Sequence, residues 1–116
     1  MAQYFKFQFM GRNYEARCTS RDTRSGFAHD CTVHDDNYND CATAHRYYLN
    51  RTWERFTYES VLHEAIYQMA QEKADRLVDR WKEENGKSRI SKEKREELTA
   101  PVWEAKKAAY DTIVRL

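Results

Sequence analysis

Residues 47–62 decide the fold of this chain, and they read Tyr47-Tyr48-Leu49-Asn50-Arg51-Thr52-Trp53-Glu54-Arg55-Phe56-Thr57-Tyr58-Glu59-Ser60-Val61-Leu62. These sixteen positions hold five aromatic residues and two arginines. Before them, apolar residues alternate with polar ones, which is typical of strands; after them, apolar residues recur with a helical period. The segment therefore marks the junction between a strand-rich first half and a helical second half.

Four strands are expected before this junction. Turns rich in Gly, Asn, Asp and Ser at residues 10–13, 21–26 and 35–40 separate them. Because these connections are short, we expect an antiparallel meander with one face left to be covered. The residues expected to share a face are Phe5, Phe7 and Phe9 on the first strand, Tyr14, Ala16 and Cys18 on the second, Phe27, His29, Cys31 and Val33 on the third, and Cys41, Thr43, His45, Tyr47 and Leu49 on the fourth.

A long helix is expected to cover that face. It would begin after Thr57 as its N-cap, follow an apolar stripe from Val61 to Trp81, and end at Gly86. At 1.5 Å per residue such a helix is about 42 Å long. Strands of six to eight residues span only about 20–27 Å. The second half of the helix should therefore extend beyond the sheet.

The C-terminal part is expected to fold back over this extension. One or two helices are expected here: Ser91 would cap a short charged helix over residues 92–98, and Pro101 would lie in the first turn of another. The apolar face of that last helix is wide, so one interpretation leaves part of it for a dimer or partner contact, and the other uses all of it within the molecule. The expected fold is α+β in one domain of residues 1–116, with a sheet half (1–50) and a helical half (51–116).

Composition limits the class of protein. The 116 residues carry a net charge of +1 with 34% charged residues, which argues against a nucleic-acid coat or a polybasic membrane anchor. No apolar run is long enough to span a bilayer, and the first ten residues do not resemble a signal peptide. Three cysteines are a poor disulfide framework, so the expected location is the reducing cytoplasm.

Metal binding and catalysis are the chemical alternatives. His29, Cys31, Cys41 and His45 would share one face if Cys31 paired near His45, and a set of two Cys and two His side chains can hold zinc. Their spacing matches no standard zinc motif, and cysteine is common in protein cores. No Gly-rich phosphate loop, nucleophile elbow or His-Glu-x-x-His helix is present. We therefore expect no metal, no cofactor and a function that is not enzymatic.

Charged residues are expected to separate between the two ends of the sheet. In a meander, the loop after the second strand and the end of the fourth lie at the same edge, which would bring Arg21 and Arg24 toward Arg51 and Arg55. The opposite edge would carry the aspartates of residues 35–40. Arginine beside tryptophan is typical of interface hot spots and of sites that bind phosphates and stacked bases. The expected partner-binding residues are Arg21, Arg24, Arg51, Trp53, Arg55 and Phe56.

Residues 47–62 also resemble a block in small uncharacterised proteins of bacteriophages and mobile elements of Gram-positive bacteria. The likeness is weaker in the arginine-rich loop and in residues 27–33, and it does not extend to residues 75–116. It implies a small accessory protein of a phage or prophage that acts in the cytoplasm of a bacterial host.

Such a protein is expected to bind and inhibit or modulate a host machine by protein–protein occlusion, with a CRISPR-Cas effector or another defence nuclease as the partner. The alternative is a small nucleic-acid-binding module, in which the arginines contact phosphates and Tyr4 or Tyr48 stacks on bases. A third alternative is a structural module that dimerises through its C-terminal helix.

Overall fold

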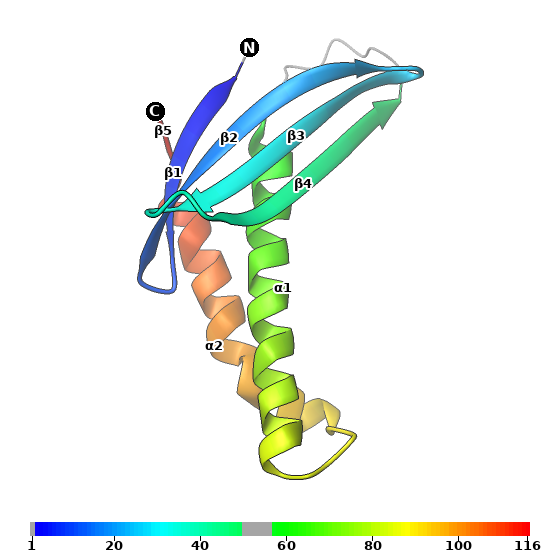
Figure 1. Cartoon of the computed structure of the whole chain (residues 1–116), viewed down its shortest axis with the longest axis vertical. Coiled ribbons are helices and arrows are strands. Elements are labelled where there is room, and N and C mark those ends of the chain that lie inside the picture. Colours follow the sequence, from blue (N-terminus) through cyan, green and yellow to red (C-terminus); the bar gives the residue numbers. More distant parts are fainter. Residues whose placement is uncertain (1, 50–56) are drawn as a thin grey trace.

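The computed structural model describes residues 2–49 and 57–116, and it shows a twisted sheet with two helices behind it (Figure 1). Within these residues the sheet has the order β4-β3-β2-β1-β5, and every neighbouring pair is antiparallel. The expected α+β class is therefore confirmed. The elements are β1 (Gln3–Phe9), β2 (Arg12–Thr23), β3 (Gly26–Asp35), β4 (Asp40–Leu49), α1 (Glu59–Glu84), α2 (Lys92–Asp111) and β5 (Val114–Arg115).

In the part of the chain that the structure describes, the sheet has five strands where four were expected. After α2, the chain adds β5 to the free edge of β1. The backbone N–H of Leu116 donates to the carbonyl oxygen of Tyr4 at 2.8 Å, and the Oγ1 of Thr112 accepts from the backbone N–H of Gln8 at 2.8 Å. A strand of two residues is too short to show an alternating pattern, so the sequence gives no signal for it.

The apolar face expected on the first three strands is the face that the helices cover. Phe7 is 2% exposed, and its ring stacks on Tyr14 with 5.5 Å between the ring centres. Leu62 and Ile66 from α1 and Val102 from α2 are buried in the same cluster. Burial of each such side chain contributes about 1.5–3 kcal/mol. The core therefore lies between the sheet and the two helices.

From Ala42 to Leu49, β4 turns the opposite face to the core from the one expected, whereas Cys41 packs against the core as expected. Cys31 of β3 lies opposite Ala44, which is fully buried. Tyr47 and Leu49, which we expected in the core, are 65% and 75% exposed. Because side chains alternate along a strand, an offset of one residue turns every side chain to the other face. The buried side chain at Ala44 is small, whereas Tyr47 and Leu49 are large and apolar. Their size therefore led to the wrong prediction of which face of β4 is buried.

α1 begins one residue later than expected and leads away from the sheet. Its N-cap position is Tyr58 rather than Thr57, and among the residues described no side chain caps it. The hydroxyl of Tyr58 instead shares a hydrogen bond of 2.9 Å with the hydroxyl of Ser20, which ties the start of α1 to β2. α1 and α2 pack side by side and extend beyond the sheet, giving dimensions of 51 × 30 × 23 Å (Figure 1).

α2 is one continuous helix, which is one of the two arrangements expected for this segment. Ser91 caps it as expected, since its Oγ accepts from the backbone N–H of Lys94 at 3.2 Å. The helix continues through Pro101, although proline lacks the N–H that would bond to the preceding turn. The hydroxyl of Thr99 donates to the carbonyl of Arg95 at 2.8 Å. Packing of this segment against the core offsets the missing backbone bond.

Most of the wide apolar face of α2 is used within the molecule. Val102 and Ala109 are almost fully buried, and Trp103, Tyr110 and Ile113 pack against the core cluster. This arrangement accounts for the apolar stripe without a second copy of the chain. Dimerisation through this helix stays a prediction that light scattering can test.

Candidate functional site

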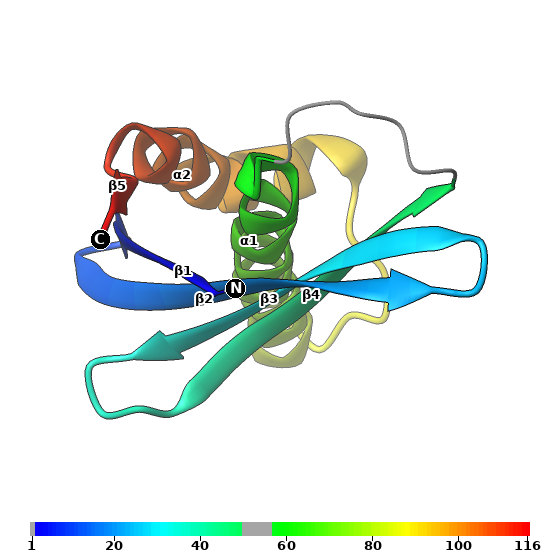
Figure 2. The same cartoon turned by 90° about the horizontal axis from the view of Figure 1, so that it is seen from above.

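The face of the sheet away from the helices is open. Both helices lie on one side of the sheet, and no described element covers the other side (Figure 2). We call this open side the outer face. Its side chains come from the positions that alternate with buried ones along β1 to β4. They include Tyr4, Lys6, Glu15, Arg17, Arg21, Asp30, His45 and Tyr47.

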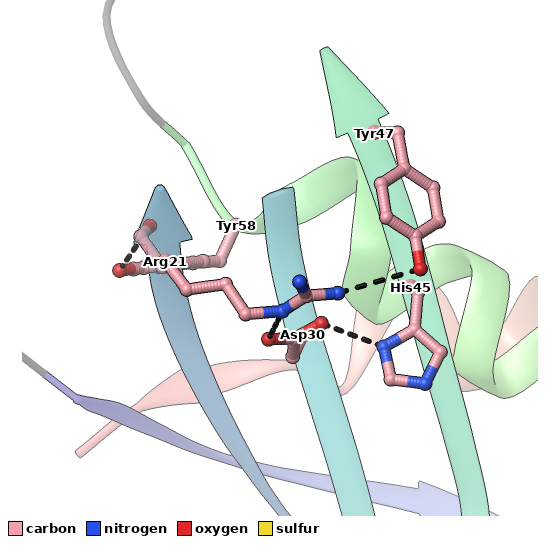
Figure 3. Close-up of polar contacts among 6 residues, drawn as sticks. Arg21, Asp30, His45, Tyr47 and Tyr58 are labelled. Atoms are coloured by element: carbon pink, nitrogen blue, oxygen red, sulfur yellow. Dashed lines mark hydrogen bonds and ion pairs between the residues drawn. The ribbon is translucent and has the colours of Figure 1, made fainter. Parts of the chain in front are cut away.

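Four of these side chains from three adjacent strands contact one another (Figure 3). Asp30 of β3 lies between Arg21 and His45: its Oδ2 accepts from the Nε of Arg21 at 2.9 Å, and its Oδ1 bonds the Nδ1 of His45 at 2.6 Å. The Nη2 of Arg21 donates to the hydroxyl of Tyr47 at 3.3 Å. The guanidinium carbon lies 5.6 Å from the centre of the Tyr47 ring. We call Arg21, Asp30, His45 and Tyr47 the outer network.

The strand register explains why these four side chains meet. Asp30 lies directly opposite His45. Arg21 and Tyr47 lie on either side of Ala28, so they belong to one row across β2, β3 and β4. Ala28 is fully buried even though it lies in an outward row, because the side chains around it cover it. Its small size leaves room for the arginine to cross the strand.

The outer network holds Asp30 in its charged form. Burial would raise the pKa of this carboxyl group, but the hydrogen bonds from His45 and Arg21 outweigh burial and lower the pKa below its usual range. An ionised carboxylate only accepts hydrogen bonds, so His45 donates through Nδ1. In the neutral imidazole, Nε2 is then the acceptor. One carboxylate thus orients two side chains, Arg21 and His45.

This dependence predicts a loss of stability in acid. The pKa of Asp30 is lower in the folded chain than in the unfolded chain, so its contribution is present at neutral pH and disappears as the pH falls through the folded value, below about 4. The contribution is roughly 1 kcal/mol, because Arg21 and His45 are about half exposed.

Urea unfolding of the wild type and of Asp30→Asn at pH 6 and at pH 3 measures this contribution. We expect the variant to be less stable than the wild type at pH 6 and the difference between the two proteins to be smaller at pH 3. A difference between the two proteins that is the same at both pH values would contradict the assignment. Groups other than Asp30 titrate in both proteins, so their effects cancel in the comparison.

Two of the six expected partner-binding residues, Arg21 and Arg24, lie among the described residues. Arg21 belongs to the outer network, and Arg24 is exposed in the turn between β2 and β3. The end of β4 reaches that turn, since Leu49 lies opposite Gly26. Arg51, Trp53, Arg55 and Phe56 lie outside the described residues. Sequence reasoning missed the roles of Asp30, His45 and Tyr47, which only the strand register reveals.

The zinc interpretation does not match the register. His45 lies on the outer face, whereas His29 and Cys31 are buried on the inner face. His29 packs between aromatic rings, with 4.6 Å between its ring centre and that of Tyr58, and burial lowers its pKa. Within residues 2–49 and 57–116, no group of three or more His, Cys, Asp or Glu side chains is arranged to hold a metal ion.

The expected aspartates of residues 35–40 lie at the other end of the sheet, where β3 turns into β4.

Comparison with known protein families, curated proteins and solved structures finds no match for this chain. Neither helix in the described part of the chain combines the length and apolar character needed to cross a membrane. The outer face therefore has to be interpreted from its own chemistry.

Proposed function

We propose that this chain is a non-enzymatic binding protein that attaches to another protein through the outer face, with the outer network at the contact. The observation that supports this most is that Arg21 is paired with a carboxylate and held in place beside an aromatic ring. Its charge is balanced by Asp30, and its side chain is held across the strands beside the exposed ring of Tyr47. Ordering these side chains before binding lowers the entropy lost on association. Arginine and tyrosine are also enriched in interface hot spots.

We also propose that the partner is a machine of a bacterial host, and that the chain is a phage or mobile-element accessory protein that inhibits it by occlusion. A CRISPR-Cas effector or another defence nuclease is the proposed target. The support is the resemblance of residues 47–62 to blocks in phage and mobile-element proteins. Tyr47 is the first residue of that block and also a member of the outer network, so both lines of support meet at one position.

Co-purification tests this function directly. The tagged chain is expressed in a Gram-positive bacterium that carries defence systems, and mass spectrometry identifies the proteins retained with it. We expect enrichment of a defence nuclease relative to an unrelated tagged protein of similar size. If only abundant proteins that also bind the unrelated control are retained, the proposed function is wrong.

A second candidate function has one observation in its favour. Tyr4 and Arg17 lie opposite each other on β1 and β2, and both are exposed on the outer face. An aromatic ring beside an arginine suits a base stacked next to its phosphate. Tyr48 does not take part, because it stacks on Phe27 on the inner face with 4.7 Å between ring centres. The pairing of Arg21 with Asp30 also weakens the outer face as a phosphate site.

Fluorescence anisotropy with labelled single-stranded DNA and RNA separates the two functions. Nucleic-acid binding would give an affinity that falls steeply as salt increases, because the arginines release counterions from phosphates. We expect no binding even at low salt. Tight, salt-sensitive binding that Arg17→Ala abolishes would favour the nucleic-acid function over the protein-binding one.

A further inference from the structure

A groove lies on the outer face at the end away from the outer network. It is about 780 Å³ in volume, which is within the range of sites that hold ligands or peptide side chains. Its floor is one row across three strands, formed by Lys6, Glu15 and His34. The C-terminus and the connection between β3 and β4 lie at this same end of the sheet (Figures 1 and 2). They form the two walls.

One wall is an exposed aromatic side chain in a fixed loop. Tyr38 is 81% exposed, and its ring stacks on His34 with 5.3 Å between ring centres. The loop is held by Asp35, whose carboxylate accepts from the backbone N–H groups of Asn37 and Asn39 at 2.9 and 3.0 Å. One face of the Tyr38 ring is therefore used by His34, and the rest is presented to solvent in a defined position.

The other wall is apolar. Val114 and Leu116 line the groove and are each 58% exposed. The antiparallel pairing of β5 with β1 holds them, including the bond from Leu116 to Tyr4. Both walls are thus fixed by backbone hydrogen bonds. An occupant would bury apolar surface on both sides without first ordering them.

The charge of the groove is negative. Among its lining residues, Lys6 is the one lysine or arginine, whereas Glu15, Asp35 and Asp36 carry carboxylates. Hydrogen bonds from Asn39 lower the pKa of Asp35, so this carboxyl group stays charged. The carboxylate of Glu15 lies 3.5 Å from the Nε2 of His34. This charge repels phosphate groups and attracts a basic occupant.

We propose that this groove binds an extended basic segment of the partner protein, with an arginine side chain against Tyr38 and its guanidinium facing Glu15 and Asp36. Arginine suits the groove better than lysine, because its planar group both stacks on an aromatic ring and pairs with carboxylates. Apolar residues that flank the arginine would contact Val114 and Leu116. This inference rests on the proposed function, since it assumes a protein partner. It adds the chemistry of the segment recognised.

A peptide titration tests the groove without the host partner. The probe is the acetylated and amidated pentapeptide Leu-Arg-Leu-Arg-Leu, and the control is the same peptide with citrulline in place of arginine, which keeps the shape and removes the charge. Two-dimensional ¹⁵N NMR of the full chain reports the binding site. We expect saturable shifts at Lys6, Glu15, His34 and Tyr38, and at least tenfold weaker binding of the citrulline peptide.

Two groove variants make the test specific. Glu15→Gln with Asp36→Asn removes charge at constant shape. Tyr38→Gly removes the aromatic wall, and glycine suits the backbone there because the φ of Tyr38 is 60°. We expect each variant to keep a dispersed wild-type-like spectrum and to bind the arginine peptide at least fivefold more weakly. Equal binding of both peptides, or shifts outside the groove, would overturn the inference.

The peptide result and the proposed function can fail separately. Co-purification of a host protein through the outer network does not depend on the peptide. Capture of a defence nuclease by a chain that shows no groove binding would therefore overturn the groove alone. Arginine-dependent peptide binding by a chain that captures no host protein would support the groove and contradict the proposed target.

Discussion

Replacing Phe7 with alanine is expected to lower the free energy of unfolding by about 3–5 kcal/mol. The side chain is 2% exposed and lies between the sheet and the helices, in contact with the ring of Tyr14. Its removal leaves a cavity that the stacked ring and the helices cannot fill, so both the transfer energy and the packing energy are lost. Small domains are stable by only about 5–15 kcal/mol, so this single change should remove a large part of the total.

Urea unfolding followed by circular dichroism measures this effect, with Tyr4→Ala as the matched control. Tyr4 is on the same strand and is also aromatic, but it points to the outer face and is 46% exposed. We expect the control to change stability by no more than about 0.5–1 kcal/mol. Equal losses for the two variants would mean that β1 does not turn one face to the core and the other to solvent.

Replacing Arg21 or Tyr47 with alanine is expected to weaken partner binding by about 30-fold or more, equivalent to roughly 2 kcal/mol. Each variant removes one side of the contact between the guanidinium and the aromatic ring. It therefore frees the remaining side chain, which must be ordered again when the partner binds. Neither residue belongs to the core cluster, so the fold should persist. Surface plasmon resonance against the co-purified host protein measures the affinity.

Arg80→Ala is the control for this binding experiment, because Arg80 is an exposed arginine on α1, away from the outer face. We expect it to change the affinity less than twofold. The double variant of Arg21 and Tyr47 should lose less than the sum of the single losses, since the two side chains act through the same contact. Strictly additive losses, or a loss for Arg80→Ala as large as that for Arg21→Ala, would place the interface elsewhere.

Alternation and periodicity predicted the coarse architecture because burial imposes them. The spacing of Phe5, Phe7 and Phe9 on β1 places Phe7 and Phe9 inside, as expected. Ser91 at the start of α2 was recognisable because a serine side chain satisfies free amide groups at a helix N-terminus. These signals act over a few residues, so the sequence displays them directly.

The features that the sequence did not predict depend on contacts between distant strands. Which face of β4 turns inward follows from the pairing of Cys31 with Ala44, and no local pattern encodes that pairing. The outer network has the same origin, since Arg21 and Asp30 are nine residues apart, and Asp30 and His45 fifteen. A polar strand residue looks like an ordinary solvent-facing one until its neighbours across the sheet are known.

Site-specific photo-crosslinking tests most directly the claim that the outer face binds a protein. A photoreactive phenylalanine analogue, which keeps an aromatic ring beside Arg21, replaces Tyr47 on the outer face in one protein and Arg80 on α1 in another, and both are irradiated in the Gram-positive bacterium used for co-purification. We predict a crosslink from position 47 to one host protein, identified by mass spectrometry as a defence nuclease, and none from position 80. A crosslink from position 80 alone, or from position 47 only to nucleic acid, would contradict the account.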